Sequence, residues 1–447
     1  MRTPGEGQSA VLHRVVRRKK RSCIILKLTG YRWYRTEIIS NRDPVKGVEK
    51  MNQTGKLLFL GAMILTLLAA GCATAPPPKE ENVFYPPPPA LPRVQFLTSL
   101  TRAKDVEGQK PGFEAFITGI KESSQRLDKP YGIAMYEGKI YVCDTNDRVF
   151  VFDLNRNTFG PLEGGKGRGK LIQPININID KDGTKYVTDP IRGQVVVFDR
   201  NDQYLKAIGT PGKWKPVDAL PYEGRVYVAD IDHSEIKVFD ATTGEMVKNF
   251  GSTGEKFEAI LDMPVNLAFD SKGYLYVSDA GKFQVVKFDR DGHFISTIGK
   301  LGLNVGHFQR PKGIAIDKED RIFVVDASFF NVQVFNRDGQ NLFFFGQGGT
   351  GPGTLILPAG IAIDHDNIKY FEKYVAPNFA IEYLVLVTSQ FGDRSVNVFA
   401  FGKEKGTKYP TDEELLEQLK ERLLRQVREK PAEGETATEA EKPAGGN

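Results

Sequence analysis

The sequence contains few cysteines and few histidines, three and five among 447 residues. The cysteines are Cys23, Cys72 and Cys143. If the mature chain begins at Cys72 and its sulfur is modified, Cys143 is the only thiol left, which excludes an intramolecular disulfide in any compartment. Because Cys143 lies in the strand-like run Ile140-Tyr141-Val142-Cys143, we expect it to be a small buried residue.

Long apolar runs are also scarce, and the one near the N-terminus is short. Leu57–Leu68 follows Lys56 and precedes Ala69-Ala70-Gly71-Cys72. A membrane-spanning helix needs about 20 apolar residues, so this run is too short for one. Residues 51–71 resemble a lipoprotein signal peptide, which implies that Cys72 is the lipidated first residue of the mature chain. Residues 1–50 would then be an upstream extension from a misassigned translation start.

Residues 72–92 are rich in proline and predict an extended tether that holds a domain away from a surface. Ala73 stands where lipoproteins retained at the inner membrane carry an aspartate. The resemblance therefore implies a bacterial envelope protein held at the outer membrane by the lipid on Cys72.

The positive charge is concentrated at the N-terminus. Residues 1–50 hold 13 Lys and Arg against 4 Asp and Glu, and taking this +9 from the total of +5 leaves −4 for the rest. A net negative chain with an export signal argues against nucleic acid as a partner.

A proline followed by an apolar strand recurs six times, at steps of 44, 42, 48, 47 and 47 residues: Pro130, Pro174, Pro216, Pro264, Pro311 and Pro358. The unit from Pro264 contains four β-rich runs, separated by loops with the glycines that tight turns need: Val265–Phe269, Tyr274–Ser278, Val285–Phe288 and His293–Ile298. Units of about 45 residues with four strands predict the blades of a β-propeller.

The sixth unit predicts how the ring closes. It ends with its third strand, Ser395–Phe401, and the missing fourth strand is available upstream as Arg93–Leu100. We expect that strand to complete the last blade, so that residues 93–403 form a closed ring without an exposed inner edge.

The motifs are similar to those of the NHL-repeat family of six-bladed propellers. They are the Pro-x-Gly/Asn-Ile-Ala starts, the Tyr-Val-x-Asp ends of the second strands and the Val-x-Phe-Asp third strands. The aspartates of the second strands are Asp144, Asp189, Asp230, Asp279 and Asp326, and Ser389 takes the place in the sixth unit. We expect these acids to accept hydrogen bonds from backbone N–H groups.

Propellers of this kind include zinc lyases and histidine-dependent lyases, which need several histidines in one place. Strand alternation puts His233 and His307 on one face of the ring and His293 and His365 on the other. Neither face collects three histidines, which argues against such a site.

Lactonases of this architecture hold a divalent cation near the axis. Asn176, Asp218 and Asn266 occupy one position in three consecutive units, and their oxygens suit Ca²⁺. The alternatives are a calcium site serving a metal-dependent hydrolase, lactonase or lyase at the channel mouth, or simply a polar channel mouth without a cofactor.

Two features outside the repeat predict contacts. Extra residues in the sixth unit, Tyr370–Tyr383, form a loop that either binds a partner or folds back on its own face, with the aromatic residues Tyr370, Phe371, Tyr374, Phe379 and Tyr383. Residues 411–430 predict an amphipathic helix capped by Thr411 and Glu414, and 431–447 a disordered tail. The sequence favours a binding or scaffold module for another envelope protein over an enzyme.

Overall fold

The computed structural model describes residues 82–107, 125–254 and 256–429, with side chains described up to residue 421. All of them belong to one compact unit, Pro78–Asn447. The upstream extension, the signal peptide, Cys72, the first part of the tether and the tail 431–447 lie outside the described residues. None of the described helices is long and apolar enough to cross a membrane.

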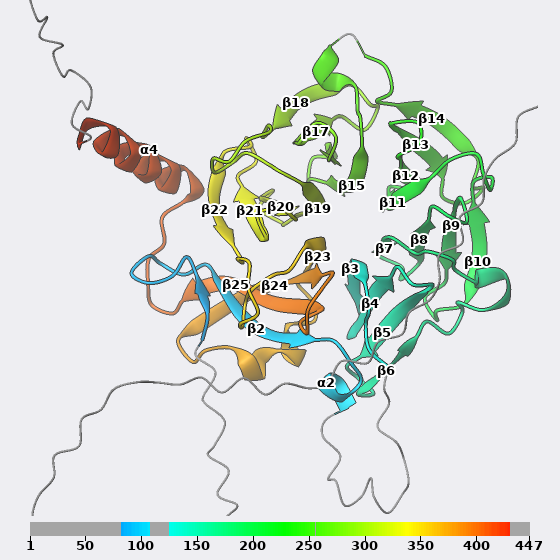
Figure 1. Cartoon of the computed structure of the whole chain (residues 1–447), viewed down its shortest axis with the longest axis horizontal. Helices are drawn as coiled ribbons and strands as arrows, with labels where there is room; N and C mark the ends of the chain where they lie inside the picture. Colours follow the sequence, from blue (N-terminus) through cyan, green and yellow to red (C-terminus); the bar gives the residue numbers. More distant parts are fainter. Residues whose placement is uncertain (1–81, 108–124, 255, 430–447) are drawn as a thin grey trace, which may run out of the picture. The chain divides into compact units, whose positions relative to one another are not determined.

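The described chain forms a six-bladed β-propeller, as predicted (Figure 1). Blades 1 to 3 are β3–β6 (Pro130–Tyr136, Lys139–Asp144, Arg148–Asp153, Thr158–Pro161), β7–β10 (Ile177–Ile179, Lys185–Asp189, Gln194–Phe198, Tyr204–Ile208) and β11–β14 (Pro216–Tyr222, Arg225–Asp230, Glu235–Asp240, Met246–Phe250). Blades 4 and 5 are β15–β18 (Pro264–Phe269, Leu275–Asp279, Gln284–Phe288, Phe294–Ile298) and β19–β22 (Pro311–Ile316, Ile322–Asp326, Asn331–Phe335, Asn341–Phe345). The strand boundaries predicted for blade 4 are correct to within one residue.

Blade 6 closes the ring with a strand from the N-terminal side, as predicted. Its order is β1-β2-β25-β24-β23, with β2 (Val94–Leu100) antiparallel to β25 (Val396–Glu404). The inner strands are β23 (Pro358–Asp364) and β24 (Phe379–Ser389). A fifth strand, β1 (Phe84–Tyr85), pairs with β2, so part of the predicted tether belongs to the blade. Tyr85 is buried there and its hydroxyl donates to the carbonyl of Gly353 at 2.9 Å.

The aspartates that end the second strands act structurally, as expected. Asp326 accepts the backbone N–H of Gln309, which precedes its blade, at 2.7 Å, and that of Ser328, which follows the strand, at 2.9 Å. In blade 6 the Oγ of Ser389 accepts the N–H of Ile356 at 3.2 Å. Each acid therefore ties the loop entering a blade to the turn after its second strand.

The C-terminal helix α4 (Asp412–Glu429) begins with the predicted cap. The N–H of Glu414 donates to Thr411 Oγ1 at 3.2 Å, and the N–H of Thr411 donates to Glu414 Oε2 at 2.9 Å. Leu416 is buried against the core between blades 5 and 6, and Asp412 forms a 3.0 Å ion pair with Arg321 of blade 5. The first turns of the helix therefore pack on the propeller beside β22 (Figure 1).

Glycine lets the inner strands approach one another closely around the axis. A Cβ atom on Gly360 of blade 6 would lie 2.3 Å from the carbonyl oxygen of Tyr131 in blade 1. A Cβ atom on Gly160, at the outer edge of blade 1, would meet no atom within 4 Å.

We expect Gly360→Ala to lower the free energy of unfolding by about 1–3 kcal/mol, because the added methyl group forces neighbouring backbone apart. Gly160→Ala is the matched control and should change it by no more than about 0.5 kcal/mol. Urea unfolding followed by circular dichroism measures both, and equal effects would show that the inner strands are not in close contact.

Candidate binding site at the mouth of the propeller channel

Five of the six inner strands share an irregularity where they begin. In five blades the register with the second strand shifts directly after the proline of the repeat, as between Pro311 and Ile314 in blade 5. Such bulges redirect side chains away from the faces of a sheet. The residues after the six prolines are Tyr131, Ile175, Val217, Val265, Lys312 and Ala359. We call the end of the ring where these prolines lie the proline face.

Lys312 of blade 5 reaches across the centre of the ring. Its Nζ lies 4.8 Å from the centre of the Tyr131 ring in blade 1, although blade 6 stands between those two blades. Ala359, the counterpart of Lys312 in blade 6, is small enough to leave this path open. Because non-neighbouring blades can meet only near the axis, Lys312 and Tyr131 mark the mouth of the central channel.

The ammonium group of Lys312 has little polar compensation. Lys312 is 5% exposed, and its Nζ donates to Gln390 Oε1 at 3.3 Å. Burial lowers the pKa of Lys312 to about 8, and the positive charges of Arg310 and Lys129 act in the same direction. Among the described residues, no carboxylate forms an ion pair with it.

The three residues predicted to hold calcium lie on the other side of the mouth, in blades 2, 3 and 4, and two of them, Asn176 and Asp218, join neighbouring blades. Asp218 Oδ1 accepts Nδ2 of Asn176 at 2.8 Å and Nδ2 of Asn178 at 2.7 Å. Asp218 Oδ2 accepts the N–H of Leu267 in blade 4 at 2.8 Å. Burial raises the pKa of Asp218 to about 7, against the lowering effect of these hydrogen bonds.

This arrangement does not present three oxygens to one cation. Asn176 turns its N–H group toward Asp218, and its Oδ1 accepts the N–H of Ile177 at 3.0 Å. Asn266 Oδ1 is buried and has no hydrogen-bond partner among the described residues. The donor set as it stands therefore does not fit Ca²⁺, and the calcium site stays a prediction for calorimetry at millimolar Ca²⁺.

The histidines are separated as expected: His233 and His307 follow β12 and β18 on the proline face, and His293 and His365 follow β17 and β23 on the other. His233 lies beside Asp230 and Glu235, which is the one group of three potential metal ligands in the described part of the chain. The ammonium of Lys237 hydrogen-bonds to Asp230 and lies 3.0 Å from Glu235 Oε1. Both carboxylates thus share Lys237 as a counter-ion.

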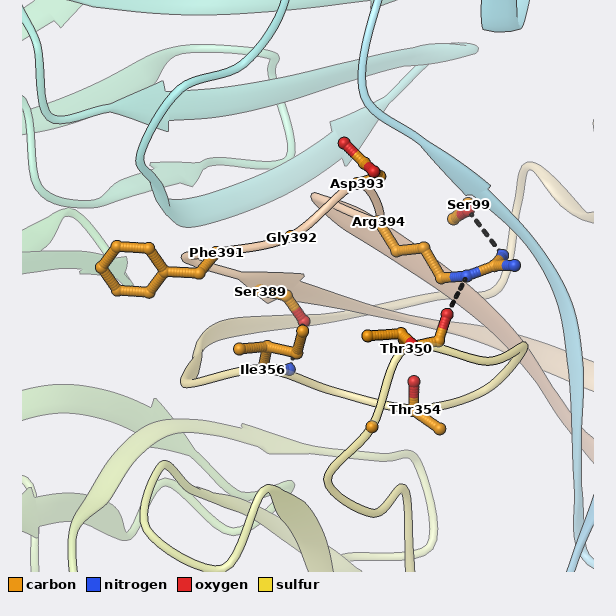
Figure 2. Close-up of a pocket in the computed structure, with 10 residues that line it drawn as sticks. Ser99, Thr350, Thr354, Ile356, Ser389, Phe391, Gly392, Asp393 and Arg394 are labelled. Carbon is orange, nitrogen blue, oxygen red and sulfur yellow. Dashed lines mark hydrogen bonds between the residues drawn. The ribbon is translucent and has the colours of Figure 1, made fainter. Parts of the chain in front are cut away.

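A pocket of about 410 Å³ opens on the proline face between blades 5 and 6. It is lined by hydroxyl groups, by Asp393 and by Arg394, whose Nε and Nη1 donate to the carbonyl oxygen of Thr350 at 3.5 Å and to Ser99 Oγ at 3.2 Å (Figure 2). Figure 2 shows Phe391 at the other end of the same loop, pointing away from Arg394. Phe391 is 52% exposed, and Gln390 beside it is the residue that contacts Lys312.

The aromatic segment predicted as a partner-binding loop is largely used for internal packing. Phe371, Phe379 and Tyr383 are buried, and the Tyr370 hydroxyl donates to Asn155 Oδ1 of blade 1. Phe379 and Tyr383 belong to β24, which begins earlier than expected because β25 also extends to pair with it. Tyr374, at 37% exposure, is the member most available to a partner.

The segment between β23 and β24, residues 365–378, overlaps that loop and contacts blade 1 on the face opposite the prolines. Asn367 Oδ1 accepts the N–H of Gly138 in blade 1 at 2.8 Å, and Gln95 of β2 bonds to the backbone of Tyr374 and Ala376. Of the two alternatives that the sequence left open, these contacts correspond to a loop folded back on its own face.

Sequence reasoning missed Lys312, Gln390 and Arg394. A usable signal was present for Lys312, because it is the single charged residue among the six that follow the prolines. Arg394 and Gln390 lie in the turn after the second strand of blade 6, where the repeat shows no shared pattern.

No protein-family model matches the chain. Among solved structures, a gluconolactonase from Xanthomonas campestris is 15% identical with a TM-score of 0.45, and the match covers 62% of this chain and 86% of that one. Virginiamycin B lyase from Staphylococcus aureus is 12% identical at a TM-score of 0.40, with 64% and 87% covered. An auxiliary nutrient-binding protein from Bacteroides thetaiotaomicron is 12% identical at a TM-score of 0.47, with 62% and 70% covered. Identities this low describe a shared fold and carry nothing about activity.

Proposed function

We propose that this chain is a bacterial envelope lipoprotein, lipidated at Cys72, whose NHL-type propeller binds another envelope protein on its proline face. The observation that carries the proposal is the pocket on this face, where Arg394 forms no ion pair with a carboxylate among the described residues and the exposed Phe391 lies at the other end of the same loop. Aromatic and arginine side chains are enriched in the cores of protein interfaces, where a few residues carry most of the binding energy.

The chemistry of the pocket indicates what the partner presents. Arg394 already donates to two neutral oxygens, and an incoming carboxylate would replace these with a charge-assisted pair. The hydroxyls of Ser99, Thr350 and Ser389 also line the pocket, whereas that of Thr354 donates to the carbonyl oxygen of Gly351 at 2.7 Å. We therefore expect an acidic side chain of the partner in the pocket and an apolar one against Phe391.

A binding role is also favoured by the way the inner polar groups are used. Asp218 and Asn176 use their hydrogen bonds to join neighbouring blades. In the Asp230–His233–Glu235 group, Lys237 forms an ion pair with Glu235. A metal-dependent hydrolase is the second candidate, and the buried, unpartnered Asn266 Oδ1 is the observation that favours it.

Cross-linking in intact cells tests the proposal. The full chain carrying Phe391→Ala and Arg394→Ala should capture its partner at least tenfold less than the wild type, as measured by quantitative mass spectrometry of the purified cross-linked material. Tyr374→Ala is the matched control, because it removes an exposed aromatic from the opposite face, and it should leave capture unchanged. Loss of capture with Tyr374→Ala alone would move the interface to the opposite face and contradict the proposal.

A further inference from the structure

We infer that the mouth of the channel is a binding site for a small organic carboxylate, with Lys312 as the counter-ion of the acid. The site is separate from the Arg394 pocket, so it does not depend on the proposed protein partner. Tyr131 and Gln390 complete it: one contributes a ring face and a hydroxyl, the other an amide.

Within the described part of the chain, the ammonium group of Lys312 has unused hydrogen-bond donors. An ammonium group has three donors, and in the described residues only Gln390 Oε1 accepts one of them, at the long distance of 3.3 Å. A second direction is taken by the face of the Tyr131 ring, which is a weaker partner than an oxygen. A buried charge with this little compensation is stabilised strongly by an anion.

The residues at the entrance to the mouth are positively charged. Arg310 and Lys129 are exposed residues at the entrances of blades 5 and 1, directly before the prolines. Both lie near enough to lower the pKa of Lys312, and Arg310 also acts on Tyr131. A positive rim above a buried positive group attracts a negative ligand into the mouth.

The side chains opposite Lys312 indicate which kind of anion would bind. Opposite Lys312, the residues after the prolines of blades 2 to 4 are Ile175, Val217 and Val265, and all three are partly exposed. The mouth is therefore cationic on one side, and the exposed surface of the other side is apolar, because Asn176, Asp218 and Asn266 on that side are buried. A carboxylate attached to an apolar body matches both sides, whereas inorganic phosphate would leave the apolar side without a partner.

The experiment uses the full-length protein and sodium benzoate as the probe. Calorimetry should detect benzoate binding, and Lys312→Met should weaken it at least tenfold, because methionine keeps the length of the side chain and removes its charge. Lys369→Met is the matched control: Lys369 also lies against a tyrosine ring, at 5.1 Å from that of Tyr370, but on the opposite face. It should leave benzoate binding unchanged.

Trace acylation of lysines, quantified residue by residue with mass spectrometry, gives a second readout that needs no variant. Benzoate should slow the acylation of Lys312 and leave that of Lys369 unaltered. Benzamide, which lacks the charge, should protect neither. Equal binding of benzamide and benzoate, equal affinity for inorganic phosphate, or benzoate binding that survives Lys312→Met would each overturn the inference. The Phe391→Ala and Arg394→Ala chain should still bind benzoate, which separates this site from the partner interface.

Discussion

Replacing Phe96 and Leu97 together with alanine is expected to lower the free energy of unfolding by about 5–10 kcal/mol, the sum of two large-to-small core substitutions. The two neighbours lie on opposite faces of β2. Phe96 packs in the core between blades 5 and 6, with its ring centre 5.6 Å from that of Phe399, and Leu97 packs in the core between blades 6 and 1. The total free energy of unfolding of a typical domain is about 5–15 kcal/mol. Most molecules of this double variant should therefore fail to fold.

The effect should exceed that of an ordinary core pair because β2 closes the ring. Without it, β25 presents an unpaired edge that can pair with other chains. Thr98→Ala is the control, because Thr98 lies in the same strand and is only partly buried. Soluble yield and urea unfolding of the single and double variants measure the effect. A double variant as stable as Thr98→Ala would show that the closing strand is dispensable.

The sequence predicts the ring well because the repeat constrains it six times over. Each unit has its own proline and five of the six end their second strand with an aspartate, so an error in one unit is corrected by the others. The closing strand follows from counting, since the sixth unit lacks one strand and Arg93–Leu100 supplies it. The extra strand at Phe84–Tyr85 could not be predicted in this way, because its pairing partner is a strand that is itself displaced from its unit.

The candidate site is harder to predict because it depends on differences between the units. Lys312 matters only because Ala359 is small and Tyr131 lies beyond it, a relation between three blades that no local pattern contains. The same limit applies to Asn176, Asp218 and Asn266. Their shared position indicates that they lie together, but which oxygens remain free depends on hydrogen bonds formed across blades.

The stability of the protein should depend on pH through Asp218, and comparison with Asp218→Asn isolates this dependence. The pKa of this buried carboxyl in the folded chain is about 7, above its ordinary value of 3.8. Between those values the folded state keeps a proton that the unfolded state releases. The contribution of Asp218 is therefore greatest below about pH 4, falls as the pH rises through 7, and is then constant. The difference between the pKa of Asp218 in the folded chain and its ordinary value corresponds to about 4 kcal/mol.

Urea unfolding of both proteins from pH 4 to pH 8 measures this contribution as the difference in free energy at each pH. The contributions of the other titrating groups are the same in both chains and cancel in the difference. The amide group of the introduced asparagine lowers the free energy of unfolding by an amount that does not vary with pH. We expect the wild type to lose about 4 kcal/mol relative to Asp218→Asn across the range. A difference that stays constant would show that the hydrogen bonds from Asn176, Asn178, Ala219 and Leu267 keep Asp218 ionised. An ionised carboxylate at this position would also be the form able to bind a cation, so the same measurement repeated with millimolar Ca²⁺ at pH 8 decides between a structural bridge and a metal ligand.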